Sequence, residues 1–133
     1  MRVYLNTSLL VRAVAGDEAA RRFLEECCKR HKCVVSSVHW REGWRRETRE
    51  AVQRLLGDLS VRVVEVELLE VEDEAWRLLR LRGWSASRLL DLMHVLAAVR
   101  LGCDAVAAVD RFIRARCREY NLLYVNHYTG CPG

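Results

Sequence analysis

Residues 1–10, MRVYLNTSLL, form the junction between strand and helix that decides how this chain folds. The apolar run at 2–5 predicts a strand, and helical spacing of apolar residues begins at position 9. Between them stand Asn6, Thr7 and Ser8, three small polar residues where a glycine turn is common. We interpret this strand end as one wall of a polar pocket and not as a turn.

The rest of the chain continues the alternation of strand and helix. Short β-branched or apolar runs predict further strands at 33–37, 61–66, 105–109 and 122–125. Apolar residues at helical spacing predict helices within 9–28 and over 38–56, 70–82, 86–101 and 111–119. This order predicts an α/β sandwich with a mostly parallel central sheet. We expect one domain over 1–126 and an irregular tail over 127–133.

The composition favours a compact globular protein. The chain has 133 residues, of which 51% are hydrophobic and only one is proline. No apolar run approaches the roughly 20 residues that cross a bilayer. The first residues also lack the pattern of a signal peptide. We therefore expect a cytoplasmic protein that does not associate with a membrane.

Arginine supplies nearly all of the positive charge. Lys29 and Lys32 are the only lysines among 22 basic residues, and the formal net charge is +4. Because a guanidinium group can bind phosphate with two donors, this bias favours a nucleic-acid partner. A GC-rich genome or the ion-pair networks of a heat-adapted protein explain it equally well.

The chain contains six cysteines, at positions 27, 28, 33, 103, 117 and 131. Their spacing does not match that of a zinc finger, even with His31 nearby. Disulfides are rare in the cytosol, except in heat-adapted organisms, which the arginine bias would suit. We expect several structural disulfides, whose pairing the spacing leaves open.

Three acidic residues lie at positions where a carboxylate is unfavourable unless it has a partner or a function. Asp110 directly follows the apolar run AVAAV, where it could also cap the next helix. Asp91 and His94 share one stripe of the very apolar helix LLDLMHVLAA. Glu42 is the third, although it could simply pair with Arg46 on a helix surface. His94 could transfer protons or be a core histidine.

These positions become informative when they are considered together. Ligands of parallel sheets collect beyond the carboxyl ends of the strands, so Asn6 and Asp110 meet if their strands are neighbours. Oxygen-rich pockets suit Mg²⁺ or Mn²⁺, and such ions assist the in-line attack of water on a phosphodiester. The sequence therefore indicates nuclease-like chemistry.

Four separated motifs resemble, in order and spacing, those of PIN-domain proteins of the VapC-like toxin type, which belong to prokaryotic toxin–antitoxin pairs. They are VYLNTSLL, VVSSVHWREGWR, SRLLDLMHVLAA and DAVAAVDRF. The resemblance implies a three-layer α/β/α sandwich and an endoribonuclease that acts on single-stranded or looped RNA. It also implies a homodimer that a small antitoxin-like protein inhibits by entering the active-site groove.

The resemblance places the catalytic, metal-binding positions of the family at Asn6, Glu42, Asp91 and Asp110, with Mg²⁺ or Mn²⁺ as cofactor. Ser8 would support this site. The family has aspartate where this chain has Asn6, and usually a threonine or serine where it has Ala108. An asparagine keeps one carbonyl oxygen but loses the charge, so metal affinity should fall. The chain is then a weakly active nuclease, an inactive protein that binds RNA or a partner, or an engineered variant.

Three arginines are candidates for binding RNA. Arg111 and Arg114 directly follow Asp110. Arg45 lies in a segment where tryptophans and arginines alternate, which could stack bases and bind phosphates. A half-buried helix with its tryptophans in the core explains that segment as well. A nucleotide-binding regulatory domain is disfavoured, because no glycine-rich phosphate loop follows the first strand.

Overall fold

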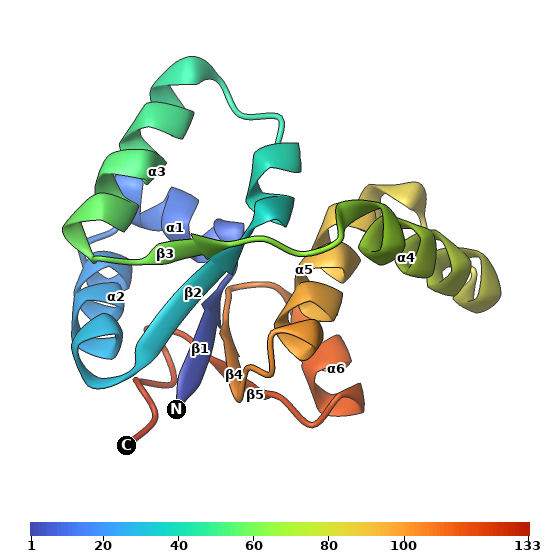
Figure 1. Cartoon of the computed structure of the whole chain (residues 1–133). Coiled ribbons are helices and arrows are strands. Elements are labelled where there is room, and N and C mark those ends of the chain that lie inside the picture. The colour runs from blue at the N-terminus through green and yellow to red at the C-terminus, as the bar shows by residue number, and fades with distance from the viewer.

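The computed structural model describes residues 1–133 and has a five-stranded sheet at its centre (Figure 1). The strands are β1 (Arg2–Leu5), β2 (Lys32–Ser36), β3 (Arg62–Val64), β4 (Ala105–Ala107) and β5 (Leu123–Val125). Their order is β3-β2-β1-β4-β5, and every neighbouring pair is parallel. The predicted α/β class is confirmed.

Six α-helices cover the two faces of the sheet. They are α1 (Thr7–Val14), α2 (Glu18–Arg30), α3 (Arg46–Asp58), α4 (Leu68–Arg82), α5 (Leu89–Arg100) and α6 (Arg111–Glu119). Val3 and Leu5 pack against α1, α2 and α3, whereas Tyr4 packs against α4, α5 and α6, because successive side chains of a strand point to opposite faces. The molecule is a three-layer α/β/α sandwich. None of its helices is long and apolar enough to span a membrane.

The direction of the strand order reverses between β1 and β4. From β1 the chain proceeds through β2 to β3, and it then returns to place β4 on the other side of β1. Leu5 pairs with Ala107, and the Asn6 amide donates to the Ala107 carbonyl at 2.9 Å. The two strand ends are therefore neighbours, which is the condition for Asn6 and Asp110 to share a pocket.

The prediction of a single helix over 38–56 is wrong. The chain instead forms a 3₁₀ helix, Ser37–Arg41, and then runs extended at Glu42 before α3 begins at Arg46. The interruption includes Gly43, a poor helix former. Glu42 has φ −69° and ψ 133°, which turns its carboxylate toward residues of other elements. These tertiary contacts outweigh the local helical periodicity.

The expectation of several disulfides is also wrong, because only Cys27 and Cys131 are bonded. Their α-carbons lie 5.5 Å apart, and the bond joins α2 to the segment after β5. Cys103 and Cys117 belong to the other core layer, where each is a buried free thiol. The sheet thus separates them from the bonded pair.

Candidate functional site

The site begins with Asn6, the first residue after β1. Its Oδ1 accepts hydrogen bonds from the Ser8 amide at 3.0 Å and the Ser8 hydroxyl at 2.7 Å, which caps α1. The Ser8 hydroxyl oxygen accepts in turn from the Val109 amide at 3.2 Å, so Ser8 joins the ends of β1 and β4. Asn6 is only 1% exposed, yet its Nδ2 has no hydrogen-bond partner. A buried donor without a partner carries a desolvation cost that a hydrogen bond would offset.

Asp110 serves as a helix cap and still contributes a free oxygen. Its Oδ1 accepts from the Ile113 amide at 3.0 Å, so the helix-cap interpretation is confirmed. Its own amide donates to the Tyr124 hydroxyl at 2.9 Å instead of continuing the β4 ladder. Oδ2 lies 3.9 Å from Nη1 of Arg88.

Asp91 lies in the first turn of α5 and faces the same arginine. Nη1 of Arg88 is 3.5 Å from Asp91 Oδ2, so one guanidinium nitrogen serves both carboxylates. Burial raises the pKa of Asp91, and the nearby Asp110 charge raises it further, while Arg88 opposes both effects. Asp91 and Asp110 are therefore a like-charged pair that a cation stabilises.

Glu42 is held by two other elements. Its Oε1 accepts from the Thr7 hydroxyl at 3.0 Å and from His94 Nε2 at 3.0 Å. Burial acts to raise the pKa of Glu42, but the hydrogen bonds from His94 and Thr7 and the favourable electrostatic interaction with His94 outweigh it and lower the pKa. The carboxylate is thus kept ionised. The alternative surface pair with Arg46 does not form, since no ion pair joins the two residues.

His94 connects Glu42 to a buried chain of hydroxyl groups. Its Nδ1 lies 2.6 Å from the Tyr4 hydroxyl, which lies 2.7 Å from the Ser36 hydroxyl. When Nε2 donates to Glu42, Nδ1 is the acceptor, and it accepts a hydrogen bond from the Tyr4 hydroxyl. Burial raises the pKa of Tyr4 well above its usual range, so the phenol remains a donor. His94 thereby fixes the position of Glu42.

His39 is a second buried histidine beside this chain. It is 2% exposed, and neither of its ring nitrogens has a hydrogen-bond partner. Its ring packs edge-on against Trp44 at 4.9 Å and lies 6.3 Å from the His94 ring. Burial, together with the neighbouring His94, lowers the pKa of His39 to about 4. It is therefore neutral near pH 7.

The residues predicted for the metal site are arranged as two pairs. Glu42 pairs with His94, and Asp91 with Asp110 through Arg88, while Asn6 engages Ser8. No group of three or more His, Cys, Asp or Glu side chains is placed to hold a metal ion. The protein thus offers two carboxylates, and not a complete set of ligands, at the β1 and β4 ends.

The predicted RNA-binding arginines are divided. Arg111 and Arg114 are exposed and line a cavity beside Asp110. Arg45 is exposed at the start of α3 and does not line that cavity. Trp40 is 46% exposed and Trp44 is half-buried, so neither tryptophan is fully buried in the protein core.

Sequence reasoning missed Arg88, Tyr4 and His39. Arg88 stands three residues before Asp91, and this helical spacing could have identified it. Tyr4 is the only residue with a polar group between the aliphatic Val3 and Leu5 of this strand. Its hydroxyl could have indicated a polar partner on the opposite face of the sheet. Nothing in the local sequence marks His39.

Comparison of the chain with models of protein families, with curated proteins and with solved structures finds no match. The fold and the geometry of the site are therefore the basis for assigning a function.

Proposed function

We propose that this chain is a PIN-like endoribonuclease that hydrolyses phosphodiester bonds in RNA with Mg²⁺ or Mn²⁺. The observation that carries the proposal is the meeting of Asp91 and Asp110 at the Arg88 guanidinium. They lie beside the reversal of strand order at β1 and β4, where open α/β sheets bind ligands. The four motifs that resemble PIN-domain toxins support the same activity.

The donor chemistry of this pair fits the ion. Mg²⁺ is usually bound by one or two carboxylates, with waters and substrate phosphates completing its shell. Asp91 and Asp110 supply two such groups, and both already contact a cationic nitrogen. When bound, the ion would activate a water molecule and offset the charge that develops on the phosphate.

The neighbouring side chains have distinct roles in the proposed reaction. Glu42 stays ionised, and both of its hydrogen bonds use Oε1, so Oε2 can orient water or accept its proton. Arg88 neutralises the two aspartates in the free protein and can pair with phosphate when RNA enters.

The proposal extends to the protein's partners. As the toxin component of a toxin–antitoxin pair, the protein would act in the cytoplasm as a homodimer. A small antitoxin-like protein would inhibit it by covering the carboxylate pair. These expectations come from the resemblance to VapC-like toxins.

One observation favours a second candidate function, a catalytically inactive PIN-like protein that binds RNA. Asn6 lacks the charge that the family has at this position, and Arg88 occupies the neighbourhood of both remaining aspartates. A site that already contains its own cation binds a metal ion less strongly. Such a protein would hold RNA without cutting it.

An RNA cleavage assay separates the two candidates. The purified chain is incubated with end-labelled RNA containing single-stranded loops, in Mg²⁺, in Mn²⁺ or in EDTA. We expect slow cleavage in both ions, none in EDTA, and loss of cleavage in Asp91→Asn. Asp104→Asn, on the opposite end of β4, is the matched control and should cleave normally. RNA that is retained in EDTA and never cut in either ion would contradict the nuclease and favour the binding protein.

A further inference from the structure

A basic cavity opens beside Asp110, between α6, β5 and the chain after β5. Its volume is about 640 Å³, within the range of roughly 300–1,000 Å³ that is common for ligand sites. Arg111, Arg114 and Arg118 line it from α6. We call it the α6–tail cavity, with the tail being residues 126–133.

The three arginines share one face of α6 and have no protein partner for their charge. They are spaced by three and four residues, so they are neighbours on the helix surface and repel one another. All three are exposed. Glu119 of the same helix does not pair with them. It pairs with the buried Arg116, at 3.2 Å. A row of unpaired guanidinium groups along a cavity suits a polyanion.

The opposite wall of the cavity carries an exposed aromatic ring. Tyr128 lines the cavity and is 72% exposed, while its ring lies 4.1 Å from that of His127. Its hydroxyl accepts a hydrogen bond from Arg12 at 3.0 Å, and its amide donates to Asn126 Oδ1 at 2.9 Å. Tyr128 is thus held through its backbone and its hydroxyl, although most of its surface is exposed.

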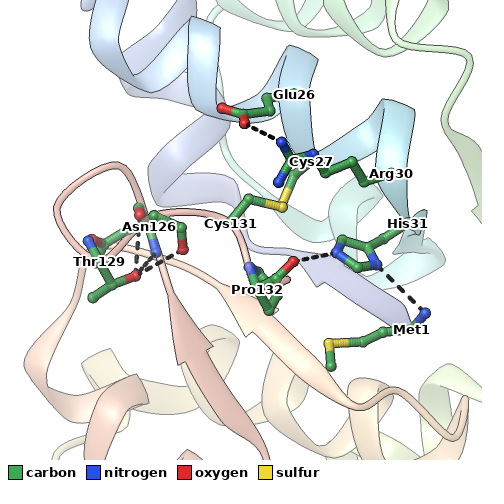
Figure 2. Close-up of a disulfide and its surroundings, with 10 residues drawn as sticks. Met1, Glu26, Cys27, Arg30, His31, Asn126, Thr129, Cys131 and Pro132 are labelled. Atoms are coloured by element: carbon green, nitrogen blue, oxygen red, sulfur yellow. Dashed lines mark hydrogen bonds and ion pairs between the residues drawn. A yellow bond between two sulfur atoms is a disulfide. The ribbon is translucent and has the colours of Figure 1, made fainter.

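The disulfide fixes this wall to the rest of the molecule (Figure 2). Cys131, three residues beyond Tyr128, is bonded to Cys27 of α2. His31 adds a contact of 2.6 Å between its Nε2 and the Pro132 carbonyl oxygen. On the other side of Tyr128, the buried Asn126 donates to the Ala108 carbonyl at 2.9 Å. Without the disulfide, the tail loses its only covalent link to α2 and keeps the noncovalent contacts at Asn126, Tyr128 and Pro132.

We propose that the α6–tail cavity binds single-stranded RNA as it leaves Asp110, and that the Cys27–Cys131 disulfide holds Tyr128 in the position that stacks a base. Arg114 and Arg118 would bind the phosphates. Proteins that bind single strands combine a basic groove with exposed aromatic rings, and only unpaired bases can stack on such a ring. The inference rests on the proposed function for RNA as the ligand, but it does not require catalysis.

Binding of a fluorescein-labelled single-stranded oligoribonucleotide, measured by anisotropy in EDTA, tests this inference without cleavage. We expect Arg114→Ala/Arg118→Ala to weaken binding about 10-fold or more and to lower the salt dependence by about two counterions. Arg77→Ala/Arg80→Ala, two exposed arginines of α4, removes the same charge and should have little effect. Equal losses in both double variants would overturn the proposed cavity.

The aromatic wall and its tether have separate readouts. Tyr128→Ala should weaken binding about 5-fold or more, whereas Tyr128→Phe keeps the ring and should bind normally. Reductant should weaken binding by the intact protein and leave Cys131→Ser, which is already weakened, unchanged. The experiment is run at a temperature at which circular dichroism shows every variant to be folded. Normal binding by Tyr128→Ala, or an effect of reductant on Cys131→Ser alone, would contradict the proposed stacking and its tether.

Failure of this inference differs from failure of the proposed function. If the cavity variants bind RNA normally while the protein cleaves it, the cavity is not the RNA path although the nuclease stands. If the intact protein binds RNA through the cavity but never cuts it, the cavity stands and the nuclease does not. Binding of an acidic peptide with no binding of RNA would overturn the inference.

Discussion

Loss of the Cys27–Cys131 bond should lower the stability of the fold substantially. The bond closes a loop over a sequence separation of 104 residues. Chain entropy assigns about 4.7 kcal/mol to a loop of roughly 100 residues, and measured values for native disulfides are commonly about 2–5 kcal/mol. We therefore expect Cys131→Ser to lower the free energy of unfolding by about 3–5 kcal/mol. For a domain of 133 residues the Tm should fall by about 11–18 °C.

Thermal unfolding followed by circular dichroism measures this change directly. The intact protein in reductant should melt with Cys131→Ser, and reductant should not shift the variant further. Cys28→Ser is the matched control, because Cys28 lies on the same helix and is not bonded. A Tm for Cys131→Ser within about 2 °C of the intact protein would refute the role of the loop in stability.

Three further predictions concern polar side chains in and around the site. The pKa of His39 is about 4 when folded and 6.5 when unfolded, so only the unfolded chain is protonated between these values. Stability should fall by about 3 kcal/mol as pH drops through this window, and His39→Leu should flatten the urea-denaturation profile. Tyr4→Phe, which leaves His94 Nδ1 without a donor, should cost about 1–3 kcal/mol in urea denaturation. Arg88→Ala removes the cation beside Asp91, so calorimetry should show tighter Mn²⁺ binding; weaker binding would mean that Arg88 supports the ion.

Features that follow from the local pattern of residues could be predicted from the sequence. The alternation of strand and helix gave the parallel sheet, and Asp110 was correctly identified as a possible helix cap. Residues 92–98 of α5 are all buried, as the largely apolar composition of this helix indicated. In each case the structure follows from residues that are close together in the sequence.

Features that depend on distant partners could not be predicted. Glu42 leaves the expected helix because Thr7 and His94, from other elements, bind its carboxylate. Cys27 pairs with Cys131 because the chain after β5 lies next to α2, and the spacing of the cysteines does not encode this position. Arg88 contacts Asp110 only because α5 begins at the edge of the sheet where β4 ends.

Restoring the missing charge tests the central claim most directly. Aspartate caps helices as well as asparagine does, so Asn6→Asp should fold normally. The measurement is the rate of RNA cleavage in Mn²⁺ by Asn6→Asp and by the double variant Asn6→Asp/Asp91→Asn, purified in the same way. We predict that Asn6→Asp cleaves at least about 10-fold faster than the unaltered chain, a change of about 1.4 kcal/mol in the barrier, and that the double variant is inactive. No cleavage by Asn6→Asp, or equal cleavage by both variants, would contradict the claim that this site is a metal-dependent nuclease.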